Sequence, residues 1–230
     1  PDPAFPAVED VLGGAAGDPG VQGVDGLDLD FVHIPSSVGA VSIRRFAYFQ
    51  ARGGATVGMD RSDAVRAAER VGDRLEARDD TLATVESCTG GLLSSTITDV
   101  PGASGYFDRG YVTYSNRAKL NLGVTRESLE AHGAVSEPAA REMAQAARDA
   151  AGTTWAVSTT GIAGPSGGTA EKPVGTVYVG IAHAGPWGTV ETDTTVDHHV
   201  YDGSRTEIKE SVVEGALSAL EAALERFGTQ

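Results

Sequence analysis

Cysteine is nearly absent from this chain, which has Cys88 alone among its 230 residues. A single thiol excludes an intrachain disulfide and a metal cluster held by several thiolates. Long hydrophobic runs are also lacking, since none approaches the roughly 20 apolar residues that cross a bilayer. The chain does not open with a secretory leader pattern. We therefore expect a cytoplasmic protein with no membrane partner.

Lysine and aromatic residues are scarce, and acidic residues outnumber basic ones. The chain has 18 basic and 32 acidic residues, a formal net charge of −14, and 6% aromatic residues. Such a polyanion lacks the basic stripe that phosphate contacts require, which argues against nucleic acid as a partner. An acidic surface stays soluble when salt screens its charges, so the composition favours a halophilic protein over an ordinary acidic one.

The composition of the chain changes near residue 58. Residues 1–58 are rich in Gly, Pro and Asp, and apart from a short strand or helix expected within 38–50 they are typical of an irregular or disordered extension. Met59 is a candidate natural initiator. Residues 59–230 have the patterns of one folded domain.

Strand and helix patterns alternate along this domain. Apolar periodicity and caps predict helices over 62–77, 91–98, 116–122, 125–131, 136–151 and 202–227. Strands are expected over 81–86, 106–114, 155–160, 174–184 and 189–196. The order, with a hairpin from the last two strands, indicates an α/β protein: a three-layer α/β/α sandwich on a mixed sheet. Ligand sites on such sheets lie at the carboxyl ends of strands, where we place loops 86–91, 114–119 and 160–173.

The segment Glu86-Ser87-Cys88-Thr89-Gly90-Gly91 is the strongest chemical signal, because it lies between a strand pattern and a helix pattern. Such a turn can present the Ser87 hydroxyl as a nucleophile beside free N–H groups of a helix start. Backbone N–H groups of Cys88, Thr89 and Gly90 would then stabilise an oxyanion. The plainer alternative is that Ser87 or Thr89 only caps the helix.

A serine nucleophile needs a base, and no Asp–His pair is conveniently placed in these loops. Lys119 can serve, because burial lowers the pKa of a lysine, whereas an arginine does not lose its proton. Tyr114 can relay a proton or hold the substrate. Taken singly, Lys119 is more typical of a solvated surface charge, and Tyr114 of an aromatic that packs in the core at a strand end.

A glycine-rich loop and a late arginine are candidates for binding an anion. Glycines let backbone N–H groups approach a phosphate, and hydroxyls add donors. The loop residues that we expect to contact substrate are Thr160, Gly161, Gly164, Gly167, Gly168 and Thr169. Arg205 opposes the dipole at the start of the last helix and can grip a phosphate or carboxylate. A flexible surface loop and an ordinary surface arginine fit these patterns equally well.

Several motifs in one order resemble the CinA C-terminal domain family, also called nicotinamide-nucleotide amidase or NMN deamidase. The motifs lie at 86–91, 99–104, 114–119, 132–136 and 160–177, and the resemblance covers about residues 62–227. It implies an α/β/α domain that hydrolyses the carboxamide of nicotinamide mononucleotide to nicotinate mononucleotide and ammonia, with no cofactor. It also implies that the family's serine, tyrosine and lysine are Ser87, Tyr114 and Lys119. The family's late arginine corresponds to Arg205.

The same family also occurs fused behind an N-terminal domain that resembles molybdopterin-binding proteins. Residues 1–58 are too short and irregular for that domain, so we expect the stand-alone form, without the pyrophosphatase activity linked to the fused domain. A catalytically silent nucleotide-binding module and an amidase for a related nucleotide amide are the alternatives. The scattered histidines give no sign of a metal site. Apolar faces left by the strands and the last helix indicate a homo-oligomer, with a dimer as the commonest form.

Overall fold

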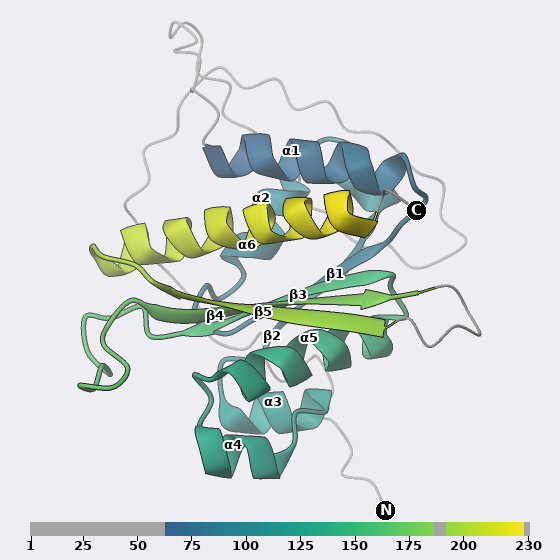
Figure 1. Ribbon diagram of the computed structural model, residues 1–230. Coiled ribbons are helices and arrows are strands. Elements are labelled where there is room, and N and C mark those ends of the chain that lie inside the picture. The colour runs from purple at the N-terminus through teal and green to yellow at the C-terminus, as the bar shows by residue number, and fades with distance from the viewer. Residues whose placement is uncertain (1–62, 186–191, 228–230) are drawn as a thin grey trace, which may run out of the picture. The chain divides into compact units, whose positions relative to one another are not determined.

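The computed structural model describes residues 63–185 and 192–227, which fold around a mixed sheet (Figure 1). The helices are α1 (Asp63–Glu76), α2 (Leu92–Thr98), α3 (Asn116–Leu122), α4 (Arg126–His132), α5 (Glu137–Ala151) and α6 (Arg205–Phe227). The strands are β1 (Leu82–Glu86), β2 (Phe107–Val112), β3 (Trp155–Gly161), β4 (Thr176–Ala184) and β5 (Thr192–Val200). A short 3-10 turn, η2 (Ala103–Gly105), precedes β2.

The sheet has the strand order β2-β1-β3-β4-β5. Strand β1 pairs in parallel with β2 and with β3, whereas β4 is antiparallel to both β3 and β5. The carboxyl ends of β1, β2 and β3 therefore lie at the same end of the sheet. The three motif loops follow these strand ends, as predicted, and the expected α/β class with a mixed sheet is confirmed.

Helices cover both faces of the sheet, which gives the predicted three layers (Figure 1). On one face α5 packs across β1, β3, β4 and β5, and α3 and α4 pack against α5. On the other face α6 packs over β3 and β4, with α1 and α2 beside it. The apolar stripe predicted for the last helix is buried, since Ile208, Val212, Leu217, Leu220 and Leu224 all lie in the core.

The helices α1 and α6 lie side by side, although the whole sheet separates them in the sequence (Figure 1). Ala68, Val71 and Leu75 of α1 are buried in the same core as α6. At the rim of this contact, Arg70 donates to both carboxylate oxygens of Glu221, at 3.0 and 3.1 Å. Exposed ion pairs contribute little to stability, because water and salt screen their charges, so apolar packing supplies most of the stability here.

The last strand is the element whose predicted bounds were most in error. It was expected to end at residue 196 but continues through Asp197, His198 and His199 to Val200. These polar residues resemble a loop pattern, yet an edge strand needs only one paired side and tolerates polar side chains on its faces. The predicted extension at 1–58, including 38–50, lies outside the described residues. Within 63–185 and 192–227, no helix combines the length and apolarity that membrane crossing requires.

Candidate active site

Ser87 directly follows β1 and begins the turn into α2. Its N–H donates to the carbonyl oxygen of Thr159 at 2.9 Å, which continues the pairing of β1 with β3. Gly90 and Gly91 then reverse the chain with φ angles of 65° and 98°, a region that favours glycine. The turn leaves Ser87 partly exposed at the carboxyl end of the sheet, where a nucleophile was predicted.

Lys119 reaches Ser87 from α3, a helix capped by the side chain of Ser115. The lysine is 1% exposed, so its interpretation as a solvated surface charge is wrong. The Lys119 Nζ donates to the hydroxyl of Ser87 at 3.0 Å and to the carbonyl oxygen of Thr113 at 2.6 Å. The structure thus brings together the serine and the lysine that the sequence singled out.

The environment of Lys119 favours its neutral form. Burial lowers the pKa of the Lys119 ammonium, and the neighbouring Cys88 thiol opposes this shift to a lesser extent. A neutral amine has a lone pair, so the contact with Ser87 can reverse and the hydroxyl can donate to the amine. The pair therefore has the geometry of a nucleophile and its general base.

Glu86 is a site residue that the sequence reasoning missed. Its buried carboxylate accepts hydrogen bonds from the N–H groups of Gly91, Leu93 and Ser94, at 2.8, 3.1 and 2.8 Å. The prediction that Ser87 lies beside free N–H groups of a helix start is wrong at these three positions, because Glu86 occupies them. The available signal was an acidic residue at the end of an otherwise apolar strand.

The residues that follow Ser87 contribute to the turn in different ways. Thr89 is buried, and its hydroxyl shares a hydrogen bond with the hydroxyl of Thr159 at 2.7 Å. Burial raises the pKa of the Cys88 thiol to about 11, so this thiol stays protonated near neutral pH. The cap position of α2 is Gly91, so the interpretation of Ser87 or Thr89 as the cap is wrong. The oxyanion role predicted for Cys88, Thr89 and Gly90 depends on their backbone N–H groups and not on these side chains, so it stays a prediction.

Tyr114 and Arg205 form a bridge at the same end of the sheet. Arg205 donates to the hydroxyl of Tyr114 at 2.9 Å and to the carbonyl oxygen of Gly164 at 2.7 Å. Tyr114 is 62% exposed, so its interpretation as a core aromatic is wrong. The structure therefore places the hydroxyl of Tyr114 against Arg205, whereas the hydrogen-bond partners of Lys119 Nζ are Ser87 and Thr113.

Polar contacts tie the glycine-rich loop to the end of α4 and to the segment that follows it. Thr160 is buried and its hydroxyl donates to the carbonyl oxygen of Ala134 at 2.7 Å. The ammonium of Lys172 donates to the carbonyl oxygens of His132 and Val135, at 3.0 and 2.7 Å. The hydroxyl of Thr160 is thus already engaged within the protein.

Three glycines of the loop are explained by close packing within the protein. A Cβ at Gly164 would lie 2.5 Å from the side chain of Val174, and a Cβ at Gly168 would lie 2.7 Å from the Val174 nitrogen. Gly161 approaches Val177 in the same way. Gly167, Gly168 and Thr169 are all exposed, and the Thr169 hydroxyl accepts from the N–H of Lys172 at 3.0 Å. Of the loop residues predicted to contact substrate, these three are the exposed ones.

Comparison with known proteins shows the family. Residues 64–224 match the family model of the CinA C-terminal domain. This chain belongs to the CinA family. A CinA-like protein of Chlorobaculum tepidum is 55% identical over 141 residues, and one of Chlorobium limicola is 50% identical over 150 residues. These alignments cover 61% and 65% of this chain but 33% and 34% of the relatives, so the chain spans about a third of their length.

Solved structures of CinA proteins share the fold. The competence/damage inducible protein CihA of Agrobacterium tumefaciens matches with a TM-score of 0.66 and 39% identity, over 71% of this chain and 96% of that one. A CinA superfamily protein of Klebsiella pneumoniae matches with a TM-score of 0.65 and 33% identity, over 71% and 98%. The CinA fold is therefore shared along nearly the full length of these two proteins.

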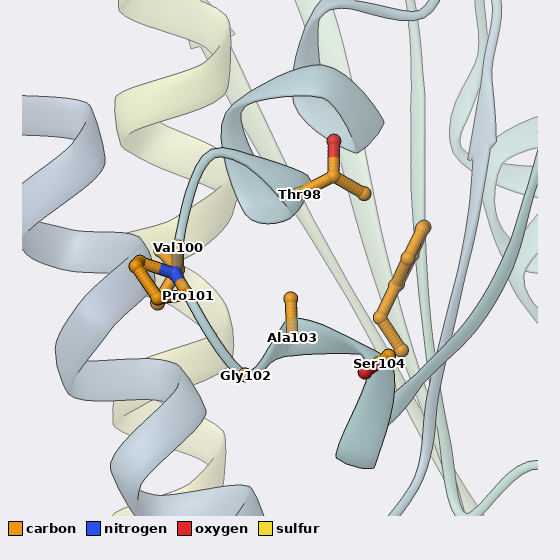
Figure 2. Close-up of a pocket in the computed structure, with 7 residues that line it drawn as sticks. Thr98, Val100, Pro101, Gly102, Ala103 and Ser104 are labelled. Carbon is orange, nitrogen blue, oxygen red and sulfur yellow. The ribbon is translucent and has the colours of Figure 1, made fainter. Parts of the chain in front are cut away.

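A cavity of about 390 Å³ lies elsewhere on this CinA domain (Figure 2). Its lining residues are Thr98, Val100, Pro101, Gly102, Ala103, Ser104 and Phe107. Because Phe107 pairs with Leu82, the first residue of β1, this cavity lies at the opposite end of the sheet from Ser87. It is separate from the candidate active site. Among the described residues, no three His, Cys, Asp or Glu side chains gather as ligands of a metal ion would.

Proposed function

We propose that this CinA-family chain is a nicotinamide-nucleotide amidase, which hydrolyses nicotinamide mononucleotide to nicotinate mononucleotide and ammonia. The observation that carries the proposal is the 3.0 Å hydrogen bond between Lys119 Nζ and Ser87 Oγ. A serine paired with a buried lysine is suited to attack on an amide carbon. The choice of substrate is supported by the motif resemblance and by membership of the family.

The proposed reaction begins with proton transfer from the Ser87 hydroxyl to neutral Lys119 as the serine oxygen attacks the carboxamide carbon. The carbonyl oxygen becomes an oxyanion, which backbone N–H groups of the 88–90 turn stabilise. Lys119 then gives its proton to the departing nitrogen, which leaves as ammonia, and the acyl group stays on Ser87 as an ester. Water, deprotonated by Lys119, hydrolyses that ester and releases the product.

The bridge between Arg205 and Tyr114 lies where the rest of the nucleotide would bind. A guanidinium has five N–H donors, so the two bonds that Arg205 makes within the protein leave capacity for a phosphate oxygen. Gly167 and Thr169 of the exposed loop supply further donors. We assign Tyr114 to holding the substrate, because its hydroxyl contacts Arg205 and its ring is exposed.

Ammonia release from nicotinamide mononucleotide tests the proposal, in high-salt and in low-salt buffer. The variants are Ser87→Ala and Lys119→Ala, with Arg117→Ala as the control, an exposed cation on the same helix as Lys119. Release by the wild type and by Arg117→Ala, lost in the other two, would support the amidase. Mass spectrometry of rapidly quenched protein checks for an ester on Ser87.

Two results would redirect the assignment. A folded wild type that binds the nucleotide without releasing ammonia would point to a silent binding module. Absence of binding would show that the assignment of nicotinamide mononucleotide as substrate is wrong. We also propose that the chain acts in the cytoplasm and forms a homo-oligomer. Light scattering after size exclusion tests the oligomeric state.

A further inference from the structure

A buried polar network surrounds the carboxylate of Glu86. Besides the three N–H groups of the α2 start, the carboxylate accepts from the hydroxyl of Ser94 at 2.6 Å. A serine hydroxyl has one proton, and Ser94 gives it to Glu86. In the 2.7 Å contact between the hydroxyls of Ser94 and Thr84, Thr84 is therefore the donor. Every acceptor in this chain of bonds has a partner, which is how a buried carboxylate is accommodated.

Strand β2 leaves room for this network. A Cβ at Gly110 would overlap the Ser94 hydroxyl and lie 2.9 Å from the hydroxyl of Thr84. Glycine at this position lets the edge strand pass directly over the two hydroxyls. The polar contacts under the strand are thus built into the packing of β1, β2 and α2.

Glu86 is also linked to Lys119 through its backbone. The carbonyl oxygen of Glu86 accepts from the N–H of Thr113 at 2.8 Å. The carbonyl oxygen of Thr113 in turn accepts from Lys119 Nζ at 2.6 Å. Ser87 is the next residue after Glu86. Glu86 therefore holds α2 through its side chain, is bonded covalently to Ser87, and is linked to Lys119 by two hydrogen bonds through Thr113.

We propose that Glu86 is a positioning residue, whose carboxylate holds the turn between β1 and α2 so that Ser87 Oγ stays within hydrogen-bond distance of Lys119 Nζ. The carboxylate contacts protein donors and does not touch the substrate. The kinetic consequence of this proposal rests on the amidase activity proposed above. The effect on Lys119 itself does not, so the two proposals can fail separately.

The variant that tests the proposal is Glu86→Gln. Glutamine keeps the size of the side chain but offers one acceptor oxygen, and its NH₂ group faces N–H groups that also donate. The matched control is Glu142→Gln. The carboxylate of Glu142 accepts from the N–H of Thr125 at 2.7 Å and from the hydroxyl of Ser128, so it also holds a helix start, that of α4.

The titration of Lys119 is a readout that does not depend on activity. The chain has three lysines, Lys119, Lys172 and Lys209, so NMR of protein labelled with ¹³C at lysine Cε gives three resolvable signals. The Lys119→Ala variant assigns the one of interest. Burial and the Cys88 thiol are the influences found on the Lys119 charge, and that thiol stays protonated near neutral pH.

We expect Glu86→Gln to raise the pKa of Lys119 towards the ordinary value of about 10.4, because a loosened turn admits water, while Glu142→Gln leaves it unchanged. In ammonia release, kcat should fall about tenfold or more, equivalent to ~1.4 kcal/mol, with KM changed little. The rising limb of the kcat–pH profile should move to higher pH together with the Lys119 titration.

An unchanged Lys119 titration in Glu86→Gln, or an equal shift in Glu142→Gln, would overturn the proposal. If Glu86→Gln does not fold, Ser94→Ala decides, because it removes one of the four hydrogen bonds and keeps the carboxylate. A smaller rise in the pKa of Lys119 in Ser94→Ala supports the proposal, and an unchanged pKa overturns it. A wild type without amidase activity leaves the titration as the deciding measurement for Glu86.

Discussion

The bridge of Arg205 to Tyr114 and Gly164 predicts energetic coupling between two residues that are far apart in the sequence. Arg205→Ala removes two hydrogen bonds from a charged donor, at 2.9 and 2.7 Å. Such bonds contribute about 1.5–3 kcal/mol when buried. Both side chains are exposed here, so solvent screening reduces the expected loss to ~1 kcal/mol in the free energy of unfolding. If the bridge shapes the substrate site, kcat/KM should fall by about fivefold for the same reason.

A double-mutant cycle isolates this coupling. Tyr114→Phe keeps the ring and removes the hydroxyl, so the pair with Arg205→Ala should show a coupling energy of about 0.5–1 kcal/mol. Urea unfolding measures it for stability, and ammonia release measures it for catalysis. The control cycle pairs Tyr114→Phe with Arg126→Ala, an exposed arginine of a surface ion pair on α4. Additivity within about 0.3 kcal/mol in the first cycle would refute the functional bridge.

Three further predictions concern Lys119, Cys88 and Gly110. Burial lowers the pKa of Lys119 in the folded state, so between that lowered value and about pH 10.4 the unfolded chain binds more protons than the folded one. The free energy of unfolding of the wild type, relative to that of Lys119→Met, should therefore increase as pH rises through this window. Parallel urea-unfolding results for the two proteins across pH would contradict this. The buried Cys88 thiol, with a pKa of about 11, should react with a thiol reagent far more slowly in the folded than in the urea-unfolded protein, and equal rates would show that it is accessible. Gly110→Ala should lower the free energy of unfolding by about 1–3 kcal/mol, since its Cβ overlaps the Ser94 hydroxyl; an unchanged urea midpoint would count against this packing.

Features set by local patterns were predictable from the sequence. The strand before Ser87 and the helix that carries Lys119 follow from apolar runs and from the Ser115 cap, which act over a few residues. The rule that ligand sites lie at the carboxyl ends of strands then placed both residues at one end of the sheet. Their direct hydrogen bond confirms that placement, while their catalytic roles stay predictions.

Features set by packing between distant elements were not predictable in this way. The contact of Tyr114 with Arg205 depends on where α6 starts relative to the loop after β2, and the sequence pattern around Tyr114 does not give that position. Glu86 was missed because an acid at a strand end is usually solvated. Its burial is acceptable only because the N–H groups of α2 face it, and a sequence pattern does not give that geometry.

The contact between α1 and α6 has a consequence for how the domain is made. Synthesis proceeds from the amino terminus, so α1, Ser87 and Lys119 leave the ribosome well before α6. Until α6 arrives, the apolar face of α1 and the adjoining face of the sheet lack their main cover, and Arg205 is not yet present to bridge Tyr114 and Gly164. A nascent chain therefore contains Ser87 and Lys119 early, but it completes its core and the bridge of Arg205 to Tyr114 only when α6 is made. Translation that stalls before residue 205 would leave an intermediate with exposed apolar surface, which chaperones bind.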